Sequence, residues 1–217
     1  GEIVALLEDD CVAADGWCRS VLRAHESPAV AIGGAIAPGN CAKSLDWAVY
    51  FCEYSRFMPP FAGPVDALPG NNVSYKRAAL IELDPSGSAK GFYETFFHWK
   101  LQESGRSLLA DPALAVTNVN SWGYVHVLGV PFHHGRSFAG LRVDGRRRWQ
   151  RLPFVGLAVF LPLIRVGRVA REVLGRRRYM GRLVQALPWI VVFSIAWASG
   201  EIVGYLLGPG KSLGRWR

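Results

Sequence analysis

Short apolar runs and segments of helical spacing alternate over the first half of the chain. Ile3–Leu7 (IVALL) is an unbroken apolar run, which predicts a strand buried on both faces, as in a parallel sheet covered by helices. Trp17 and Val21 lie at helical spacing and predict a helix over Gly16–His25. Val30–Gly34 (VAIGG) is a second apolar run, ended by glycines, and predicts another strand.

The middle of the chain continues this alternation. The aromatic-rich segment Lys43–Phe57 predicts a helix whose rings belong to the core, with the lining of an acceptor groove as the alternative. A brief strand over Val73–Tyr75 and a short helix over Lys76–Leu83 are expected next. A further helix is predicted over Tyr93–Ser104, closed by Gly105.

Three shorter segments complete this part of the chain. Asp84–Gly91 (DPSGSAKG) predicts a flexible loop. Leu108–Asp111 and Ala113–Asn118 predict strands at an edge of the sheet. Strands that alternate with helices indicate an α/β fold.

Two apolar segments dominate the last third of the chain. Leu152–Ile164 contains two prolines and is shorter than the roughly 20 residues that span a bilayer, so an interfacial or re-entrant helix is predicted. Leu183–Leu207 is long enough to span, with Glu201 as its only charge. A carboxylate within a membrane is costly, so Glu201 is expected near the far interface or facing a partner.

The charge is divided unevenly along the chain. The formal net charge is +8, but residues 1–141 have 10 Lys and Arg against 14 Asp and Glu, whereas residues 142–217 have 15 against 3. Seven arginines lie between the two apolar segments: Arg165, Arg168, Arg171, Arg176, Arg177, Arg178 and Arg182. Basic clusters beside apolar helices favour anionic membrane lipids over nucleic acid as partners, and place this connector on the cytoplasmic side. Lys211 and Arg215 flank the other end, so a spanning helix and a hairpin within one leaflet both stay open.

Cysteine usage and the first residues indicate the cellular setting. Cys11, Cys18, Cys41 and Cys52 form no C-x-x-C pair, which favours reduced thiols in the cytosol over disulfides or a zinc site. The chain begins at Gly1 beside a strand, without an initiator Met or a signal peptide, so a piece of a longer protein is expected.

The candidate chemistry starts with three consecutive acids, Glu8, Asp9 and Asp10, at the carboxyl end of the first predicted strand. Carboxyl ends of strands in open α/β sheets face the ligand crevice. Adjacent carboxylates repel one another, and a bound Mg²⁺ or Mn²⁺, held by one or two carboxylates and substrate phosphates, offsets that cost. The alternative is a solvated acidic turn, with Asp15 as the N-cap of the next helix.

Further candidates lie on turns and at helix starts. Glu94 either complements the dipole of its helix or acts as a general base. Gly70 allows a ligand to approach the backbone closely, and the amides of Asn71 and Asn72 either bond sugar hydroxyls or close the turn.

A His-His-Gly-Arg cluster lies before the apolar tail. His133 and His134 can supply a metal ligand, and Arg136 a guanidinium that binds phosphate. Histidines with a purely structural role are the alternative.

Five stretches occur in a particular order along the chain. They are LLEDD (6–10), DGW (15–17), LPGNNVSYKRAAL (68–80), FYETFFHWKLQESG (92–105) and HGRSFAGLR (134–142). In this order they resemble the C-terminal half of a family 2 glycosyltransferase. The last stretch and the basic, apolar tail are similar to membrane-associated bacterial members. The resemblance covers residues 1–142 and depends on the order of the motifs.

The resemblance implies a fold and an activity. Residues 1–142 would form an incomplete glycosyltransferase A fold, an α/β Rossmann-like sheet with flanking helices, and residues 143–217 a basic, membrane-associated helical tail. The family moves a sugar from a nucleotide-diphosphate donor to an acceptor hydroxyl with inversion. The resemblance therefore implies a nucleotide-sugar donor and a glycan or lipid-linked acceptor, in bacterial cell-surface synthesis at the cytoplasmic face of the inner membrane.

The resemblance also assigns roles to residues. The family's D-x-D motif falls on Glu8-Asp9-Asp10, so Asp10, with Glu8 in the place of the first Asp, would coordinate Mg²⁺ or Mn²⁺. Glu94 would be the general base, and Tyr93 stands where the family has an acid. The resemblance gives the donor diphosphate to Asp9, Arg136, His133 and His134, and the acceptor to Gly70, Asn71, Asn72 and Tyr93.

Two departures from the family limit the expected activity. The Q-x-x-R-W motif of processive synthases is missing, because Arg148-Trp149 has no Gln three residues before the Arg, and this predicts transfer of a single sugar. The family binds the nucleotide base with strands that precede the acidic motif, and the sequence does not contain them. The chain alone is therefore expected to be inactive, to expose a sheet edge and to associate.

Two other classes of protein stay open. A membrane-anchored binding or scaffold protein would tolerate the loss of Asp10 or Glu94. A metal-dependent hydrolase using Glu8, Asp10 and the histidine pair would release free sugar or phosphate without an acceptor.

Overall fold

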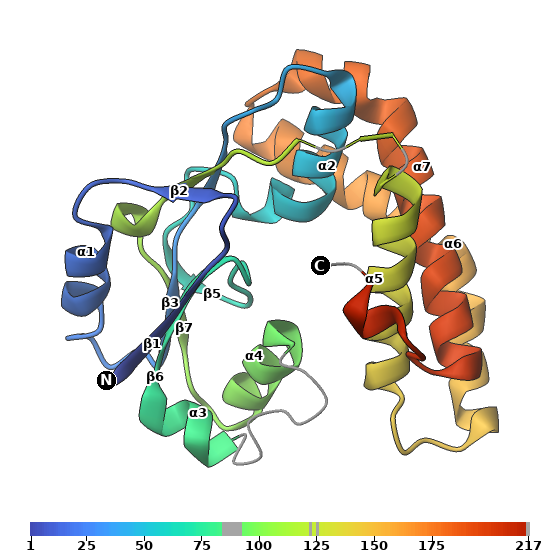
Figure 1. Cartoon of the computed structure of the whole chain (residues 1–217). Coiled ribbons are helices and arrows are strands. Elements are labelled where there is room, and N and C mark those ends of the chain that lie inside the picture. Colours follow the sequence, from blue (N-terminus) through green and yellow to red (C-terminus); the bar gives the residue numbers. More distant parts are fainter. Residues whose placement is uncertain (84–92, 122, 125, 216–217) are drawn as a thin grey trace. The chain divides into compact units, whose positions relative to one another are not determined.

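The computed structural model describes residues 1–83, 93–121, 123–124 and 126–215 (Figure 1). In those residues the protein is a mixed α/β structure with two sheets and seven α-helices. The chain forms two compact units: Gly1–Asn40 with Phe57–Asn120, and Cys41–Arg56 with Ser121–Arg217. Both sheets belong to the first unit, and the long apolar helices belong to the second.

The larger sheet has five strands in the order β1-β6-β3-β7-β5. They are β1 (Ile3–Leu7), β6 (Asn72–Lys76), β3 (Ala31–Gly33), β7 (Leu108–Ala110) and β5 (Gly63–Val65). β3 and β7 pair in parallel, whereas the pairs β1–β6, β3–β6 and β5–β7 are antiparallel. The strands predicted over Ile3–Leu7, Val30–Gly34 and Val73–Tyr75 are confirmed.

The position of the first strand corrects the prediction made for it. Among the described strands β1 pairs with β6 alone, in antiparallel register, so it lies at an edge. Leu7 at its end is 40% exposed. The expectation of a parallel strand buried on both faces is wrong, because an apolar run has the same pattern in an internal strand and in an edge strand.

A smaller sheet has three strands. β8 (Val116–Asn118) lies between β2 (Cys11–Ala13), its antiparallel partner, and β4 (Ile36–Pro38), its parallel partner. The strands predicted over Leu108–Asp111 and Ala113–Asn118 therefore exist, but their expected edge position is wrong. β7 and β8 each pair on both sides.

Three α-helices belong to the first unit: α1 (Trp17–Ala24), α3 (Arg77–Leu83) and α4 (Glu94–Glu103). They confirm the three helices predicted in this part of the chain. Gly16, with a φ of 80°, is the N-cap of α1, so Asp15 does not have the capping role considered for it. Gly105, with a φ of 75°, follows α4 as predicted. The predicted loop Asp84–Gly91 lies outside the described residues.

α4 packs against the larger sheet through an aromatic contact. The rings of Tyr75 on β6 and Phe97 on α4 lie 5.2 Å apart at 88°, an edge-to-face arrangement. Leu101, one turn later on α4, and Leu108 on β7 are buried in the same cluster. The hydrophobic face of α4 therefore fixes how the helix lies on β6.

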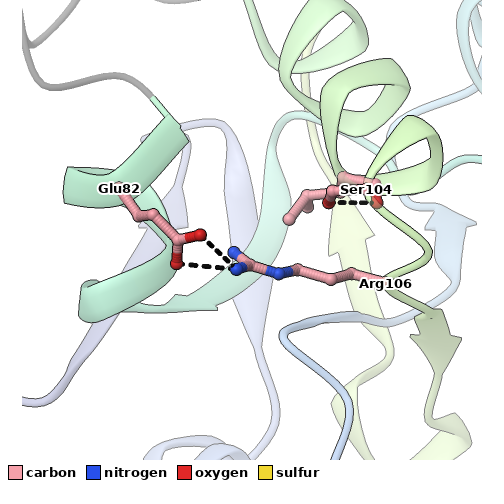
Figure 2. Close-up of polar contacts among 4 residues, drawn as sticks. Glu82, Ser104 and Arg106 are labelled. Atoms are coloured by element: carbon pink, nitrogen blue, oxygen red, sulfur yellow. Dashed lines mark hydrogen bonds and ion pairs between the residues drawn. The ribbon is translucent and has the colours of Figure 1, made fainter.

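A surface ion pair connects α3 to the segment after α4 (Figure 2). Arg106 Nη2 lies 2.6 Å from both carboxylate oxygens of Glu82. Ser104 Oγ donates to the carbonyl oxygen of Leu101 at 2.7 Å and satisfies a carbonyl at the end of α4. Because the Glu82 side chain is 60% exposed, the ion pair contributes at most about 1 kcal/mol to stability.

The second unit is helical. It contains α2 (Ser44–Tyr54), α5 (His126–Arg142), α6 (Arg148–Arg176) and α7 (Met180–Leu207), with 3-10 turns at Ser55–Phe57 and Ser212–Gly214. The helix predicted over Lys43–Phe57 is confirmed by α2 and the turn that follows it. Trp47, Tyr50 and Phe51 are buried, which favours the core interpretation of its aromatic residues.

Two helices, α6 and α7, are long and apolar enough to cross a membrane. For Leu183–Leu207 this agrees with the sequence. Leu152–Ile164, however, lies within a 29-residue helix, so the expected short length is wrong, and the interfacial or re-entrant position stays a prediction. Pro153 and Pro162 lie within α6 without ending it. Arginine-rich turns on both sides of Leu152–Ile164 are also helical, so α6 is longer than its apolar segment.

Glycines allow α5 and α7 to pack with their backbones close together. A Cβ atom at Gly200 of α7 would overlap the carbonyl oxygen of Phe132 on α5. Four residues later, a Cβ at Gly204 would overlap the carbonyl oxygen of Arg136, and a Cβ at Gly135 of α5 would overlap that of Trp197. This spacing is the small-xxx-small arrangement that brings membrane helices together.

Glu201 lies between these two glycines of α7 and faces the interior of the second unit. Its carboxylate accepts hydrogen bonds from Trp197 Nε1 at 2.7 Å and from the Tyr205 hydroxyl at 2.9 Å. Arg142 on α5 donates to the same hydroxyl at 3.3 Å. Glu201 therefore faces side chains of the protein, one of the two environments expected for it, and its depth in a membrane stays a prediction.

Candidate functional site

The acidic residues form a tight turn between β1 and β2. The backbone N–H of Cys11 donates to the carbonyl oxygen of Glu8 at 3.0 Å, which closes the turn. Glu8 and Asp9 are exposed and Asp10 is half-buried. The backbone N–H of Glu8 also approaches the carbonyl oxygen of Asn71 at 3.5 Å, so the turn lies beside the segment that leads into β6.

Cys11 connects the acidic turn to its surroundings. Its Sγ accepts from Asn71 Nδ2 at 3.3 Å and from Asn118 Nδ2 at 3.9 Å, and it donates to Asp10 Oδ1 at 3.5 Å. Burial, together with the charge of Asp10, raises the pKa of Cys11 to about 12. The thiol is therefore protonated and acts as a donor to the carboxylate of Asp10.

The carboxyl group of Glu94 packs directly on Gly70. A Cβ atom at Gly70 would lie 2.5 Å from Glu94 Cδ and 2.7 Å from Oε1. A side chain larger than hydrogen at position 70 would therefore displace the carboxyl group. Gly70 contacts Glu94, and the next residue, Asn71, contacts Cys11. Two consecutive residues therefore connect these two contacts.

The register of α4 explains why Glu94 reaches this place. Phe97 and His98 lie one turn after Glu94 on the same side of the helix. Phe97 packs on Tyr75, and the Tyr75 hydroxyl and His98 Nε2 lie 2.8 Å apart. Because these contacts fix the middle of α4 near the end of β6, the first turn of α4 lies near the start of β6, where Gly70 is found.

Burial changes the acid–base properties of Glu94. It raises the pKa of the carboxyl group above its ordinary value, and the hydrogen bond from the residue's own backbone N–H opposes that change. The pKa of Tyr75 is raised by burial and by the nearby charge of Glu94. A carboxylate with a raised pKa is a stronger base than one in water, as general base catalysis requires.

The two asparagines form hydrogen bonds inside the first unit. Asn72 is fully buried, and its Nδ2 donates to the carbonyl oxygen of Leu114 at 2.7 Å. Asn71 Nδ2 is used by Cys11. These contacts join the two amides to residues distant in sequence and do not close the turn, and the acceptor role of Gly70, Asn71, Asn72 and Tyr93 stays a prediction.

Comparison with known proteins adds no assignment. No protein-family model and no curated protein matches the chain. Conclusions about chemistry therefore depend on the contacts described above.

Glu8 and Asp10 are the candidate ligands for the predicted cation. Among the described residues no group of three His, Cys, Asp or Glu side chains is arranged to hold a metal ion. Mg²⁺, however, is usually held by one or two carboxylates together with substrate phosphates and water. The exposed position of Glu8 and the half-buried position of Asp10 fit a site of this open kind.

The remaining predicted donor-binding residues belong to the second unit, where each has local contacts. His133 Nδ1 lies 3.0 Å from Ser212 Oγ, and the ring of His134 lies 4.6 Å from that of Trp197. Arg136 Nε donates to the carbonyl oxygen of Gly208 at 3.2 Å. These contacts connect α5 with α7 and the turn after it, as structural side chains do.

Sequence reasoning missed three residues that position this site. Cys11 follows the acids directly, and a thiol between two asparagine amides has no recognisable spacing in sequence. Tyr75 and His98 support α4 under Glu94. The four-residue interval from Glu94 to His98 was a usable signal, because it puts both side chains on one face of a helix.

Replacing Glu94 with glutamine should change how stability depends on pH. The folded-state pKa of Glu94 lies above its ordinary value of 4.5, so the folded protein binds this proton more tightly than the unfolded chain. Wild-type stability should fall as pH rises from the ordinary value through the raised pKa. Since glutamine does not titrate, the thermal midpoint of Glu94→Gln minus that of wild type should increase over this range.

The matched control is Glu103→Gln, at the exposed last residue of α4. Its difference from wild type should not depend on pH. A Glu94→Gln difference that is constant or decreases between pH 4 and 8 would show that the carboxyl group is not buried in the folded protein.

Proposed function

We propose that the protein is an inverting, metal-dependent glycosyltransferase that moves one sugar from a nucleotide-diphosphate donor to an acceptor hydroxyl of a glycan or glycolipid. The activity is that of family 2 glycosyltransferases, to which the order of motifs is similar. The proposed fold of the first unit is that of glycosyltransferase A, and the proposed location is the cytoplasmic face of the bacterial inner membrane.

One observation supports this proposal most directly. The carboxyl group of Glu94, a half-buried residue, packs on Gly70, and the next residue, Asn71, donates to the thiol that in turn donates to Asp10. A candidate base and candidate metal ligands, which lie more than 80 residues apart in sequence, are thus connected through one short segment. Inverting transfer needs a base and a phosphate-binding cation near the same reacting carbon.

The proposed reaction is a single displacement. The acceptor oxygen bonds to the anomeric carbon while the bond from that carbon to the diphosphate oxygen breaks, and Glu94 takes the hydroxyl proton. Attack on the face opposite the leaving group inverts the anomeric centre. A divalent cation at Glu8 and Asp10, when bound, neutralises negative charge on the departing diphosphate.

The second unit supports the proposed membrane association. α6 is long and apolar enough to span, and large apolar side chains such as Leu157, Phe160 and Leu163 are at least 60% exposed on it. Contiguous exposed apolar surface on a helix of this length is unfavourable in water and favourable in lipid.

Asp10→Asn tests the proposal. Mn²⁺ binding to the purified protein, followed by electron paramagnetic resonance, should weaken at least about tenfold, since changes even to groups around a metal's ligands cost that much. Sugar transfer by membranes from cells that express the complete coding sequence should fall to background. Asparagine has nearly the same volume as aspartate, so the turn should stay folded.

The control is Asp15→Asn, which changes an exposed carboxylate in the same unit. It should leave Mn²⁺ binding and transfer unchanged. Full transfer by Asp10→Asn would contradict the proposal. Release of free sugar that does not need an acceptor would instead indicate a hydrolase.

A further inference from the structure

Six of the seven arginines between residues 165 and 182, which lie on α6, on α7 and in the turn between them, divide into two groups by their contacts. Arg176 forms an ion pair with Glu172 and donates to the carbonyl oxygen of Arg56 at 2.8 Å. Arg178 lies over the ring of Tyr179 at 5.5 Å, and Arg182 lies over that of Trp47 at 5.8 Å. In this first group, protein acceptors and aromatic rings already surround the guanidinium groups.

The second group consists of Arg165, Arg168 and Arg171, which follow one another at three-residue intervals along α6. Residues at this spacing are neighbours on a helix surface. Arg165, Arg56 and Arg171 act on Arg168 as nearby positive charges, and Glu172 opposes them. Because Glu172 is paired with Arg176, its charge is already partly used.

This group contains hydrogen-bond donors that the protein does not use. Within the described part of the chain, neither Arg168 nor Arg171 makes a hydrogen bond or an ion pair with another residue. Arg165 packs over the ring of Trp197 at 4.2 Å and its side chain forms a hydrogen bond with Cys52, whereas its buried Nε has no hydrogen-bond acceptor. Neighbouring guanidinium groups without protein acceptors, here those of Arg168 and Arg171, are stabilised by an anion that reaches both.

The apolar surface of α6 ends where this group begins. Leu157, Phe160 and Leu163 are exposed on the preceding turns, with Leu163 at 75%. Ile164, immediately before Arg165, is 48% exposed. A helix with this order of side chains puts its arginines at the depth of the phosphate layer when the apolar turns lie in hydrocarbon.

We propose that Arg165, Arg168, Arg171 and Arg56 form a binding site for the phosphate of an anionic membrane phospholipid. The acyl chains of that lipid would lie along the exposed apolar turns of α6. All of these residues belong to the second unit, so this lipid site does not depend on the glycosyltransferase activity proposed for the first unit.

The surface favours a phospholipid over a soluble anion. A free phosphate would use the guanidinium groups but leave the adjoining apolar turns without a partner. A phospholipid has the phosphate and the hydrocarbon in the same order as the side chains along α6. Both parts of the surface therefore contribute to binding one molecule.

Native mass spectrometry of the protein released from nanodiscs tests this site. Nanodiscs of equal parts phosphatidylcholine and phosphatidylglycerol should yield wild-type protein that retains phosphatidylglycerol. The double variant Arg168→Gln/Arg171→Gln should retain it roughly 25-fold less, at about fivefold for each arginine lost near a membrane surface. Both substitutions are on exposed residues, so the thermal midpoint should not change.

The control is Arg148→Gln/Arg151→Gln, which removes the same charge from the first turn of the same helix. It should retain phosphatidylglycerol as wild type does. Equal losses in both double variants, or retention of phosphatidylcholine to the same extent, would overturn the proposal. Displacement of the lipid by millimolar inorganic phosphate would identify a site for a soluble anion instead.

Discussion

Membranes that contain Glu94→Gln should transfer sugar roughly 10²–10⁴ times more slowly than membranes with the wild-type protein. Glutamine keeps the size of the side chain against Gly70 but cannot accept the proton of the acceptor hydroxyl. The loss should appear in kcat, because the proton moves in the transition state. Initial rates with a labelled nucleotide-sugar, measured in membranes from cells that express the complete coding sequence, give this value.

Gly70→Ala separates a catalytic role of Glu94 from a structural one. The new methyl group would meet the flexible end of Glu94, so the carboxyl group should move while the fold stays intact. Transfer should decrease with little change in the thermal midpoint, and Glu103→Gln on the same helix should behave as wild type. Wild-type rates in Glu94→Gln would exclude Glu94 as the base.

Gly200→Ala should destabilise the second unit by at least about 1–3 kcal/mol, the usual cost of an overfilled core. The added methyl group would overlap the backbone carbonyl of Phe132, and backbone atoms cannot move aside as a side chain can. α5 and α7 would have to separate, which would also disturb the hydrogen bond from Arg142 on α5 to the Tyr205 hydroxyl on α7. Thermal unfolding in detergent, followed by circular dichroism at 222 nm, measures the effect.

Gly181→Ala is the matched control, because it lies on the same helix and a Cβ there meets no atom within 4 Å. It should stabilise the helix by about 0.5–1 kcal/mol, since alanine loses less backbone entropy than glycine. Opposite signs for the two substitutions are expected. A stabilising effect of Gly200→Ala would mean that α5 and α7 do not pack through Gly200.

Most of the secondary-structure elements of this protein are predictable from its amino-acid sequence alone. Helices over Gly16–His25 and Tyr93–Ser104, and strands over Ile3–Leu7 and Val73–Tyr75, were predicted and are present. Helical spacing, short apolar runs and a closing glycine such as Gly105 are local signals, so they are readable without a partner. The mixed α/β class follows from their alternation.

The sequence also identified candidate chemistry but not its supports. Glu8, Asp10 and Glu94 were recognisable as carboxylates at a strand end and a helix start. The thiol of Cys11 and the Tyr75–His98 contact, which position those carboxylates, depend on residues brought together by folding. Sequence spacing puts Glu94 and His98 on one face of a helix, but it contains no signal for the contacts of Cys11 or for the pairing of His98 with Tyr75.

The order of the strands in the sheets and the close backbone contacts between helices are visible only in the tertiary structure. β1 lies at an antiparallel edge and β7 in the interior of the sheet, although both are short apolar runs, because pairing depends on partners that are distant in sequence. Nothing in the sequence distinguishes Gly70 and Gly200 from the other glycines. They matter because Glu94 packs against Gly70 and the backbone of Phe132 packs against Gly200. Local pattern thus determines what each segment is, whereas packing between distant segments determines what it contacts.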